Sequence, residues 1–170
     1  MAYLSRWARL AAGLLLLLSV APATAGDERS LDERCRAEVV ELHEFLEEWS
    51  NAELPDTEEA FARFRDVIAP SFLIIGPDGE QAGQEPIVEA IRRAHGRWSE
   101  APGGIRIENY RLHHAAGGLA LATYEEWHEL GEPRGRLSTV LFGPNDETPN
   151  GIEWLHLHEV WIEPSPTGSD

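Results

Sequence analysis

Two histidines near the C-terminal end of the chain are the residues best placed to do chemistry. His156 and His158 stand two residues apart in a segment, residues 150–162, that is rich in aromatic and branched side chains. This composition is typical of a β-strand. Residues two apart on a strand point to the same face, roughly 6.6 Å from each other, so both imidazoles should lie beside Trp154. Since imidazole exchanges protons near neutral pH, the segment predicts a polar patch in an apolar wall, as in a ligand pocket.

Strict alternation along this strand defines two faces. One face carries Ile152, Trp154, His156, His158 and Val160, and the other carries Leu155, Leu157, Glu159 and Trp161. Alternation alone does not say which face is concave. We expect the histidine face to line the cavity and the face of Leu155, Leu157 and Trp161 to form a dimer interface. In the alternative arrangement, the leucine face covers the first helix and the histidines face outward.

Polar side chains on the two preceding strands complete the predicted site. The strand over residues 119–130 presents Tyr124, Glu126 and His128 on one face, and Arg136 precedes the next strand. Tyr124 would donate a hydrogen bond, Glu126 would share a proton with a histidine, and Arg136 would pair with an anionic group of the ligand. We therefore predict the catalytic residues His156, His158 and Glu126, and the ligand-binding residues Tyr124, His128, Arg136 and Trp154.

A metal site is a second interpretation of the histidine pair. His-x-His on one strand face, with a carboxylate from elsewhere, suits zinc or a similar ion. Such pairs also line cavities without binding metal, and the adjacent His113 and His114 should face opposite sides. The single cysteine, Cys35, has no sulfur partner and is expected to be a small buried hydrophobe on a helix. We predict a site without metal or cofactor.

The charge balance narrows the class of partner. The chain of 170 residues has 30 acidic and 14 basic residues, and every basic residue is arginine. Lysine Schiff-base chemistry and a P-loop lysine are therefore excluded. Nucleic acid is an unfavourable partner because such binding neutralises phosphates with basic side chains, and an anionic membrane surface is unfavourable for the same reason. A small-molecule ligand is the predicted partner.

The N-terminal segment has the form of a secretory signal peptide. Arg6 and Arg9 precede an apolar run over residues 10–20, and the small-residue sequence 23–25, Ala-Thr-Ala, follows. These are the three parts of such a signal, and the apolar run is shorter than the roughly 20 residues that span a bilayer. We predict a signal peptide over residues 1–25, cleaved near Ala25, a linker over 26–30, and a secreted or periplasmic product without stable membrane insertion.

The remaining chain predicts helices followed by strands. Ser30 and Glu33 form a capping box before a helix that runs to about Ala52. A second helix, capped by Asp56, ends at Pro70. Further along, the patterns predict a short strand over 72–75, a turn at 77–79, a helix from about 85 to 96, four strands after 104 with a bulge at 109–110, and a flexible tail over 164–170. Helices first and strands afterwards favour an α+β fold.

This order and several loose motifs resemble the nuclear transport factor 2-like superfamily. Within it, the chain is most similar to the SnoaL-like group and to the association domain of calcium/calmodulin-dependent protein kinase II. The resemblance covers the predicted domain, residues 31–163. The matching pieces are Phe61-x-x-Phe64 through Pro70-x-Phe72, the turn 77–79, Thr123-Tyr124, Gly135-Arg136-x-x-Thr139 and Trp154-x-His156-x-His158.

The resemblance implies a cone-shaped α+β fold, in which three N-terminal helices pack in a curved, mostly antiparallel sheet. It also implies a pocket inside the cone and a homodimer formed through the sheet. Members include isomerases, polyketide cyclases, dehydratases, hydrolases and pure binders, so the fold does not give the function. We expect an exported domain with a small-molecule pocket, for ligand binding or for cofactor-free acid–base chemistry. The alternative is a non-catalytic dimerisation, assembly or binding module.

Overall fold

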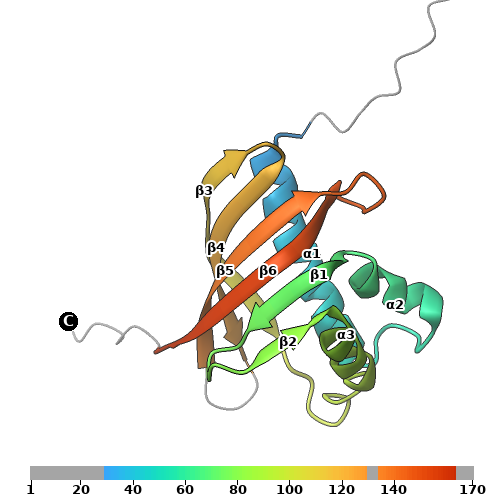
Figure 1. Ribbon diagram of the computed structural model, residues 1–170. Coiled ribbons are helices and arrows are strands. Elements are labelled where there is room, and N and C mark those ends of the chain that lie inside the picture. Colours follow the sequence, from blue (N-terminus) through green and yellow to red (C-terminus); the bar gives the residue numbers. More distant parts are fainter. Residues whose placement is uncertain (1–28, 130–133, 164–170) are drawn as a thin grey trace, which may run out of the picture.

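The computed structural model describes residues 29–129 and 134–163 (Figure 1). The predicted signal peptide and the predicted tail lie outside the described residues. Within the described part of the chain, no helix has the length and apolar character needed to cross a membrane.

In the described part of the chain, three helices and one six-stranded sheet make up the fold (Figure 1). The helices are α1 (Leu31–Ser50), α2 (Glu58–Arg65) and α3 (Gln84–Arg93). The strands are β1 (Ile68–Ile75), β2 (Gln81–Gly83), β3 (Ile105–Ala116), β4 (Leu119–His128), β5 (Arg134–Pro144) and β6 (Ile152–Ile162). The strand order is β2-β1-β6-β5-β4-β3, and only the β1–β6 pair is parallel. The predicted α+β class and the mostly antiparallel sheet are confirmed.

Helix α1 lies along one side of the sheet and supplies much of the core. Its capping box is present, with the Ser30 hydroxyl accepting from the Glu33 backbone N–H and the Glu33 side chain accepting from the Ser30 backbone N–H. Cys35, Val39 and Trp49 on its buried side are fully shielded from solvent, as apolar residues at helical spacing predict. Burial raises the pKa of the Cys35 thiol to about 11, so this thiol is unreactive, as expected for a residue that only packs.

The boundaries of the second helix differ from the prediction. Thr57, rather than Asp56, caps α2 by accepting from the Ala60 backbone N–H. The helix ends at Arg65, and Pro70 lies inside β1. The short strand β2 escaped prediction because three residues carry too little pattern to recognise; it pairs with the end of β1.

Two of the register shifts in the sheet decide which way side chains point near the cavity. The bulge predicted at residues 109–110 is confirmed, since the register of β3 on β4 shifts between Glu108 and Arg111. A second bulge, which was not predicted, lies in β6: Phe142 pairs with Trp154, but the neighbouring Leu141 pairs with His156. Leu155 is the extra residue. A bulge of one residue moves every following side chain to the opposite face.

The sheet therefore has an inner face toward the helices and an outer face away from them. On β6, Trp154 faces inward before the bulge, and Leu157, Glu159 and Trp161 face inward after it, because they pair with the inward Val140, Ser138 and Arg136. His156, His158 and Val160 lie on the outer face, opposite Leu141, Thr139 and Leu137. The predicted placement of the two histidines beside Trp154 is wrong, and so is the predicted outward placement of Leu157 and Trp161.

Candidate ligand-binding pocket

A cavity opens between the inner face of the sheet and the helices. Its deep part, the inner chamber, has a volume of about 120 Å³ and is walled mostly by apolar side chains of α1, β1 and α3. Five polar side chains reach it, those of His43, Tyr124, Glu126, Arg136 and Glu159. An apolar cavity of about 150 Å³ is enough to hold benzene, so the chamber has room for a short alkyl chain.

A second, more polar cavity adjoins the inner chamber. This vestibule has a volume of about 360 Å³, and its lining includes Arg97, Arg134, Arg136, His128 and Trp161. Glu126 and Arg136 line both cavities. The two cavities therefore meet at the ion pair of Glu126 and Arg136. The inner chamber is the apolar end, and the vestibule is the cationic end.

Glu126 is the centre of the polar cluster, and it is 3 % exposed. One carboxylate oxygen, Oε1, lies 2.6 Å from His128 Nε2 and accepts from the Arg136 guanidinium. The other, Oε2, lies 3.3 Å from His43 Nε2. Burial by itself would raise the pKa of Glu126, but the hydrogen bonds from His128 and His43 and the charge of Arg136 outweigh it and hold that pKa well below its usual range. Glu126 is therefore an ionised anchor.

The proton positions around His43 follow from its partners. Its Nδ1 lies 2.6 Å from the Val39 carbonyl oxygen, which can only accept, so Nδ1 carries a proton. Its Nε2 lies 3.3 Å from Glu126 Oε2. This buried contact joins α1 to β4.

Arg136 links two buried carboxylates. Its guanidinium bonds Glu126 and also donates from Nη1 to Glu159 Oε2 at 3.2 Å. Burial raises the pKa of Glu159, and the neighbouring Glu126 charge adds to that effect, whereas Arg136 opposes it. One arginine is shared by two carboxylates whose pKa values move apart, which is an arrangement that active sites use for acid–base work.

Three buried polar atoms beside the chamber lack a hydrogen bond of ordinary geometry among the described residues: the Tyr124 hydroxyl, the Ser138 hydroxyl and Arg136 Nε. Burial raises the pKa of Tyr124, and a weak contact with the Ser138 side chain opposes that rise. Tyr124 and Ser138 are cross-strand neighbours, and Glu126 and Arg136 form the next such pair on the same face. Burying a polar group without a partner costs about 1–3 kcal/mol. A water molecule or a ligand oxygen in the chamber would offset this cost.

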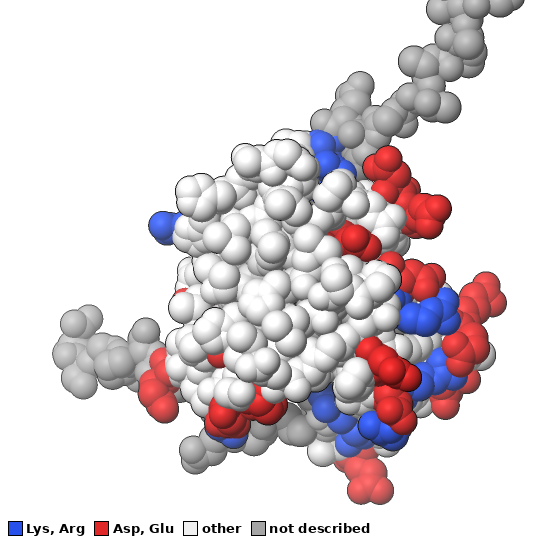
Figure 2. All heavy atoms as spheres, in the orientation of Figure 1, with Lys and Arg blue, Asp and Glu red and all other residues white. Residues whose placement is uncertain are grey.

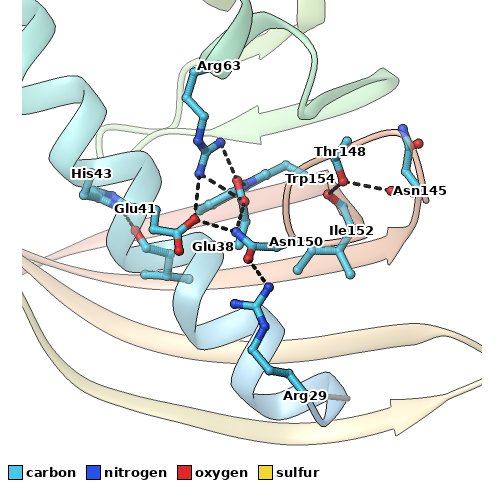
Figure 3. A network of polar contacts seen from close by, with 11 residues as sticks. Arg29, Glu38, Glu41, His43, Arg63, Asn145, Thr148, Asn150, Ile152 and Trp154 are labelled. Carbon is cyan, nitrogen blue, oxygen red and sulfur yellow. Dashed lines mark hydrogen bonds and ion pairs between the residues drawn. The ribbon is translucent and has the colours of Figure 1, made fainter. Parts of the chain in front are cut away.

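A separate buried network fixes the opposite wall of the chamber (Figure 3). Glu38 on α1 accepts two hydrogen bonds from Arg63, one from Asn150 Nδ2 and one from Trp154 Nε1. Figure 3 shows these side chains meeting between α1, α2 and the start of β6. Since both Glu38 oxygens are satisfied, the network is structural: it holds Trp154 in place as part of the chamber wall.

Five of the seven predicted site residues lie at this cavity and two do not. Tyr124, Glu126 and Arg136 line the inner chamber, as does Trp154, and His128 lines the vestibule. His156 and His158 lie on the outer face because of the bulge at Leu155. Among the described residues, no group of three or more histidine, cysteine or acidic side chains is arranged to hold a metal ion.

The sequence-based prediction missed residues that the structure brings to the site, chiefly His43, Glu159 and Arg97. The signal for His43 was present, since it stands four residues after Val39 and three before Leu46 on the apolar side of α1. Glu159 was assigned to the opposite face to Trp154 because the bulge was not recognised. Arg97 lies after α3 in a segment without regular structure, so no periodicity points to it.

Another groove, of about 600 Å³, lies between α2 and α3. Its charged side chains pair with one another: Glu58 contacts both Arg65 and Arg92 at 3.2 and 3.0 Å. Among the described residues that line this groove, none has a buried polar side-chain atom without a partner, unlike those of the cavity under the sheet.

Comparison with known families identifies the domain. Residues 35–163 match the family model described as the C-terminal domain of sucrose-6-phosphate phosphohydrolase. The chain belongs to this family. Sucrose-phosphatase 1 from Nicotiana tabacum is 24% identical over 128 residues, which are 74% of this chain but only 30% of that protein. The chain thus spans about a third of the length of its curated relatives.

Solved structures show the same fold. An NTF2-like protein of unknown function from Pseudomonas aeruginosa matches with a TM-score of 0.67 and 23% identity, covering 76% of this chain and 99% of that one. A CaMKII hub from S. rosetta matches with a TM-score of 0.59 and 11% identity, covering 79% and 98%. The predicted nuclear transport factor 2-like cone is confirmed, and at these identities the likeness concerns the fold alone.

Proposed function

We propose that this protein is an exported binder of a small anionic molecule, whose apolar part occupies the inner chamber and whose anionic group lies in the vestibule. The observation that carries the proposal is the cationic vestibule of a strongly acidic chain. With 30 acidic and 14 basic residues, most arginines are expected to find a carboxylate. Arg97 and Arg134 have no ion pair within the described residues, and each lies over a tryptophan ring, Trp98 and Trp161 respectively. Other arginines without an ion pair, such as Arg36 and Arg111, are exposed on the surface, whereas these two line the same cavity.

The electrostatics of Arg97 support the same proposal. Burial and the nearby charge of Arg136 lower the pKa of Arg97, while Glu126 partly opposes them. An arginine held close to another cation is stabilised by an anion placed between them, and a guanidinium suits carboxylate and phosphate groups. Arg134 and Arg136 line the same vestibule.

The shape of the cavity favours one class of anion. The names of the curated relatives refer to sucrose phosphate, and a phosphate would suit the vestibule. A sugar, however, would bring many hydroxyls to an inner chamber whose walls are mainly apolar, where unpaired polar groups are costly. An organic acid with a short apolar chain satisfies both ends, with the unpaired Tyr124 hydroxyl available to a further oxygen.

If the protein is an enzyme, the proposed reaction is acid–base chemistry on the bound ligand. His128 bonds Glu126 through Nε2 and has a side chain 26% exposed to the vestibule. A carboxylate that orients a histidine is a common arrangement for a general base. Glu126 itself is a poor base because three donors hold its charge, so His128 is the group that would exchange a proton with a ligand.

Calorimetric titration with hexanoate, acetate and sucrose 6-phosphate at fixed ionic strength tests the proposal. Hexanoate should bind more tightly than acetate because its chain buries apolar surface in the inner chamber. Arg97→Ala should weaken hexanoate binding roughly ten- to a hundredfold, the effect of losing one charged hydrogen bond. Arg106→Ala is the matched control, since Arg106 pairs with Glu108 and Glu129 on the surface. The proposal is contradicted if the wild type, Arg97→Ala and Arg106→Ala bind hexanoate equally. It is also contradicted if the wild type binds sucrose 6-phosphate more tightly than hexanoate.

An assembly role is the second candidate, and the outer face of the sheet favours it. Of the five large hydrophobic side chains exposed among the described residues, four lie on this face: Leu73, Leu119, Leu137 and Val160. One fold neighbour is a CaMKII hub and another a putative kinase association domain. A homodimer formed through this face would leave the ligand cavity, on the other side of the sheet, open.

A further inference from the structure

The outer face differs from the rest of the surface in charge. Figure 2 views the molecule from this side, and the middle of the face is free of coloured side chains, while acidic and basic groups gather at its margins. For a chain with a net charge of −16, this is the face on which two copies meet with the least repulsion between carboxylates. In Figure 1, α1 passes behind the sheet, and side chains of all three helices line the inner chamber, which lies on the side of the sheet away from this face.

The size of the face suits a second copy. Strands β4, β5 and β6 have 10 or 11 residues each, so the face is roughly 35 Å long at about 3.4 Å per residue. Six strands spaced about 4.8 Å apart make it roughly 24 Å wide. The resulting area, roughly 800 Å², matches what each partner contributes to a typical stable interface.

Two histidines lie near the middle of this face, because β6 is the third of the six strands. His156 pairs across the sheet with Leu73 and Leu141, and His158 pairs with Ile75 and Thr139. Neither imidazole has a hydrogen bond or an ion pair to another described residue.

The titratable groups facing the two histidines are few. No element among the described residues packs over the outer face, so these groups come from the sheet itself. Cross-strand neighbours form rows across the sheet. The row of His156 continues through Leu121 to His114, and the row of His158 continues through Thr123 to Arg111. In the row of His158, His113 Nε2 also lies 2.8 Å from Thr123 Oγ1. Of the rows on either side, the one through Val160 and Leu137 reaches Glu125 and Glu108. The one through Gly143 begins at Glu153, whose carboxylate accepts a hydrogen bond from Asn145 Nδ2. No carboxylate lies in the rows of the two histidines to stabilise a charged imidazole.

We propose that a second copy of this chain docks on the outer face and that His156 and His158 make this association weaken as the pH falls. The inference rests on the assembly candidate above and is independent of the ligand pocket. Imidazole is the side chain that gains its charge between about pH 5 and 8. Each copy would have to bury two charged imidazoles against apolar neighbours, which is costly without a counter-charge.

The predicted direction is opposite to the effect of overall charge. Acidification makes this acidic chain less negative, and lower repulsion between copies should strengthen association. Weaker association at lower pH therefore isolates the contribution of the histidines.

Sedimentation equilibrium of the purified protein at about pH 8 and about pH 5.5 tests the proposal. The dimer dissociation constant should rise at least about tenfold at the lower pH. In the double variant His156→Gln and His158→Gln, the dimer should persist at both values. Leu137→Arg should give monomer at pH 8, whereas Glu89→Gln, which changes the net charge by the same amount on α3, should not.

Three results overturn the proposal: a wild-type monomer at pH 8, a dimer that is equally stable at both pH values, or a glutamine variant as sensitive to pH as the wild type. Hexanoate titration of the same samples distinguishes a failure of the dimer proposal from a failure of the pocket assignment. The substituted residues lie outside the cavity, so the variants should bind hexanoate like the wild type.

Discussion

At the scale of residues, Glu126 does most to define the site, because its two carboxylate oxygens contact His43, His128 and Arg136. Its position among the even residues of β4 was predictable from the alternation, as were those of Tyr124 and His128. Its partner His43 was not recognised, although it stands on the apolar side of the first helix. Pairing between distant elements depends on how the helix lies on the sheet, which periodicity within one element does not contain.

The depressed pKa of Glu126 predicts a loss of stability in acid. The unfolded state takes up a proton near pH 4.5, whereas the folded state stays ionised to lower pH, so the unfolded state binds more protons as the pH falls. The free energy of unfolding should therefore decrease below about pH 4.5. Urea denaturation between about pH 6 and 3 should show this slope in the wild type and a shallower one in Glu126→Gln. An identical slope in both proteins would show that Glu126 does not carry the effect.

The unpaired hydroxyl of Tyr124 predicts a gain in stability when it is removed. Tyr124→Phe keeps the ring, which packs edge-on against His43 at 5.3 Å, and removes a buried polar group without a partner. The ligand-free variant should unfold at an equal or higher temperature than the wild type, while its affinity for a ligand that bonds this hydroxyl falls. Calorimetric melting measures the first effect. A variant destabilised by more than about 2 kcal/mol would mean that the hydroxyl already has a partner.

At the scale of elements, the bulge at Leu155 decides which residues of β6 enter the cavity. The prediction treated the strand as one uninterrupted alternation, and so exchanged the histidine face with that of Leu157 and Glu159. The signal was present: Trp154 and Leu155 are consecutive apolar residues, a phase change like the one that correctly predicted the bulge at Asn109 in β3. Alternation along a strand therefore predicts which face a side chain occupies only up to the next phase change in the pattern.

Deletion of Leu155 tests the role of the bulge. Without the extra residue, the strand after it turns over, which moves His156 and His158 inward and exposes Leu157 and Glu159. Arg136 would also lose Glu159, its second carboxylate. We expect an unfolded or aggregated product by circular dichroism and light scattering. Leu155→Ala keeps the register and should remain folded, with only a moderate loss of stability. A deletion variant that folds and binds like the wild type would contradict this account of the strand.

At the scale of the whole molecule, helices followed by long alternating strands predicted the fold class, and the resemblance of this order and of several motifs to known proteins predicted the superfamily. It did not predict the two-part cavity. That cavity depends on Arg97 after α3 and on the ends of β4 and β5 meeting in space, and neither is visible as a motif. The acidic composition indicated only which partners are unfavourable, whereas the structure places Arg97 and Arg134, two arginines without an ion pair among the described residues, in one vestibule.

Export is the whole-molecule prediction that the N-terminal sequence carries. The basic start, the apolar run and the segment Ala23-Thr24-Ala25 predict cleavage after Ala25. Intact-mass analysis of the protein produced by its native host should give a chain that begins at Gly26. Retention of Met1 in a membrane fraction would exclude the signal peptide and the predicted location.

The cavity under the sheet, apolar at one end and cationic at the other, is the central feature of the account. A crystal structure of the protein soaked with hexanoate tests it most directly. The account predicts the carboxylate within hydrogen-bond distance of Arg97 or Arg134 and the alkyl chain in the inner chamber against Trp154. An empty cavity at saturating hexanoate, or a carboxylate that contacts no vestibule arginine, would contradict it.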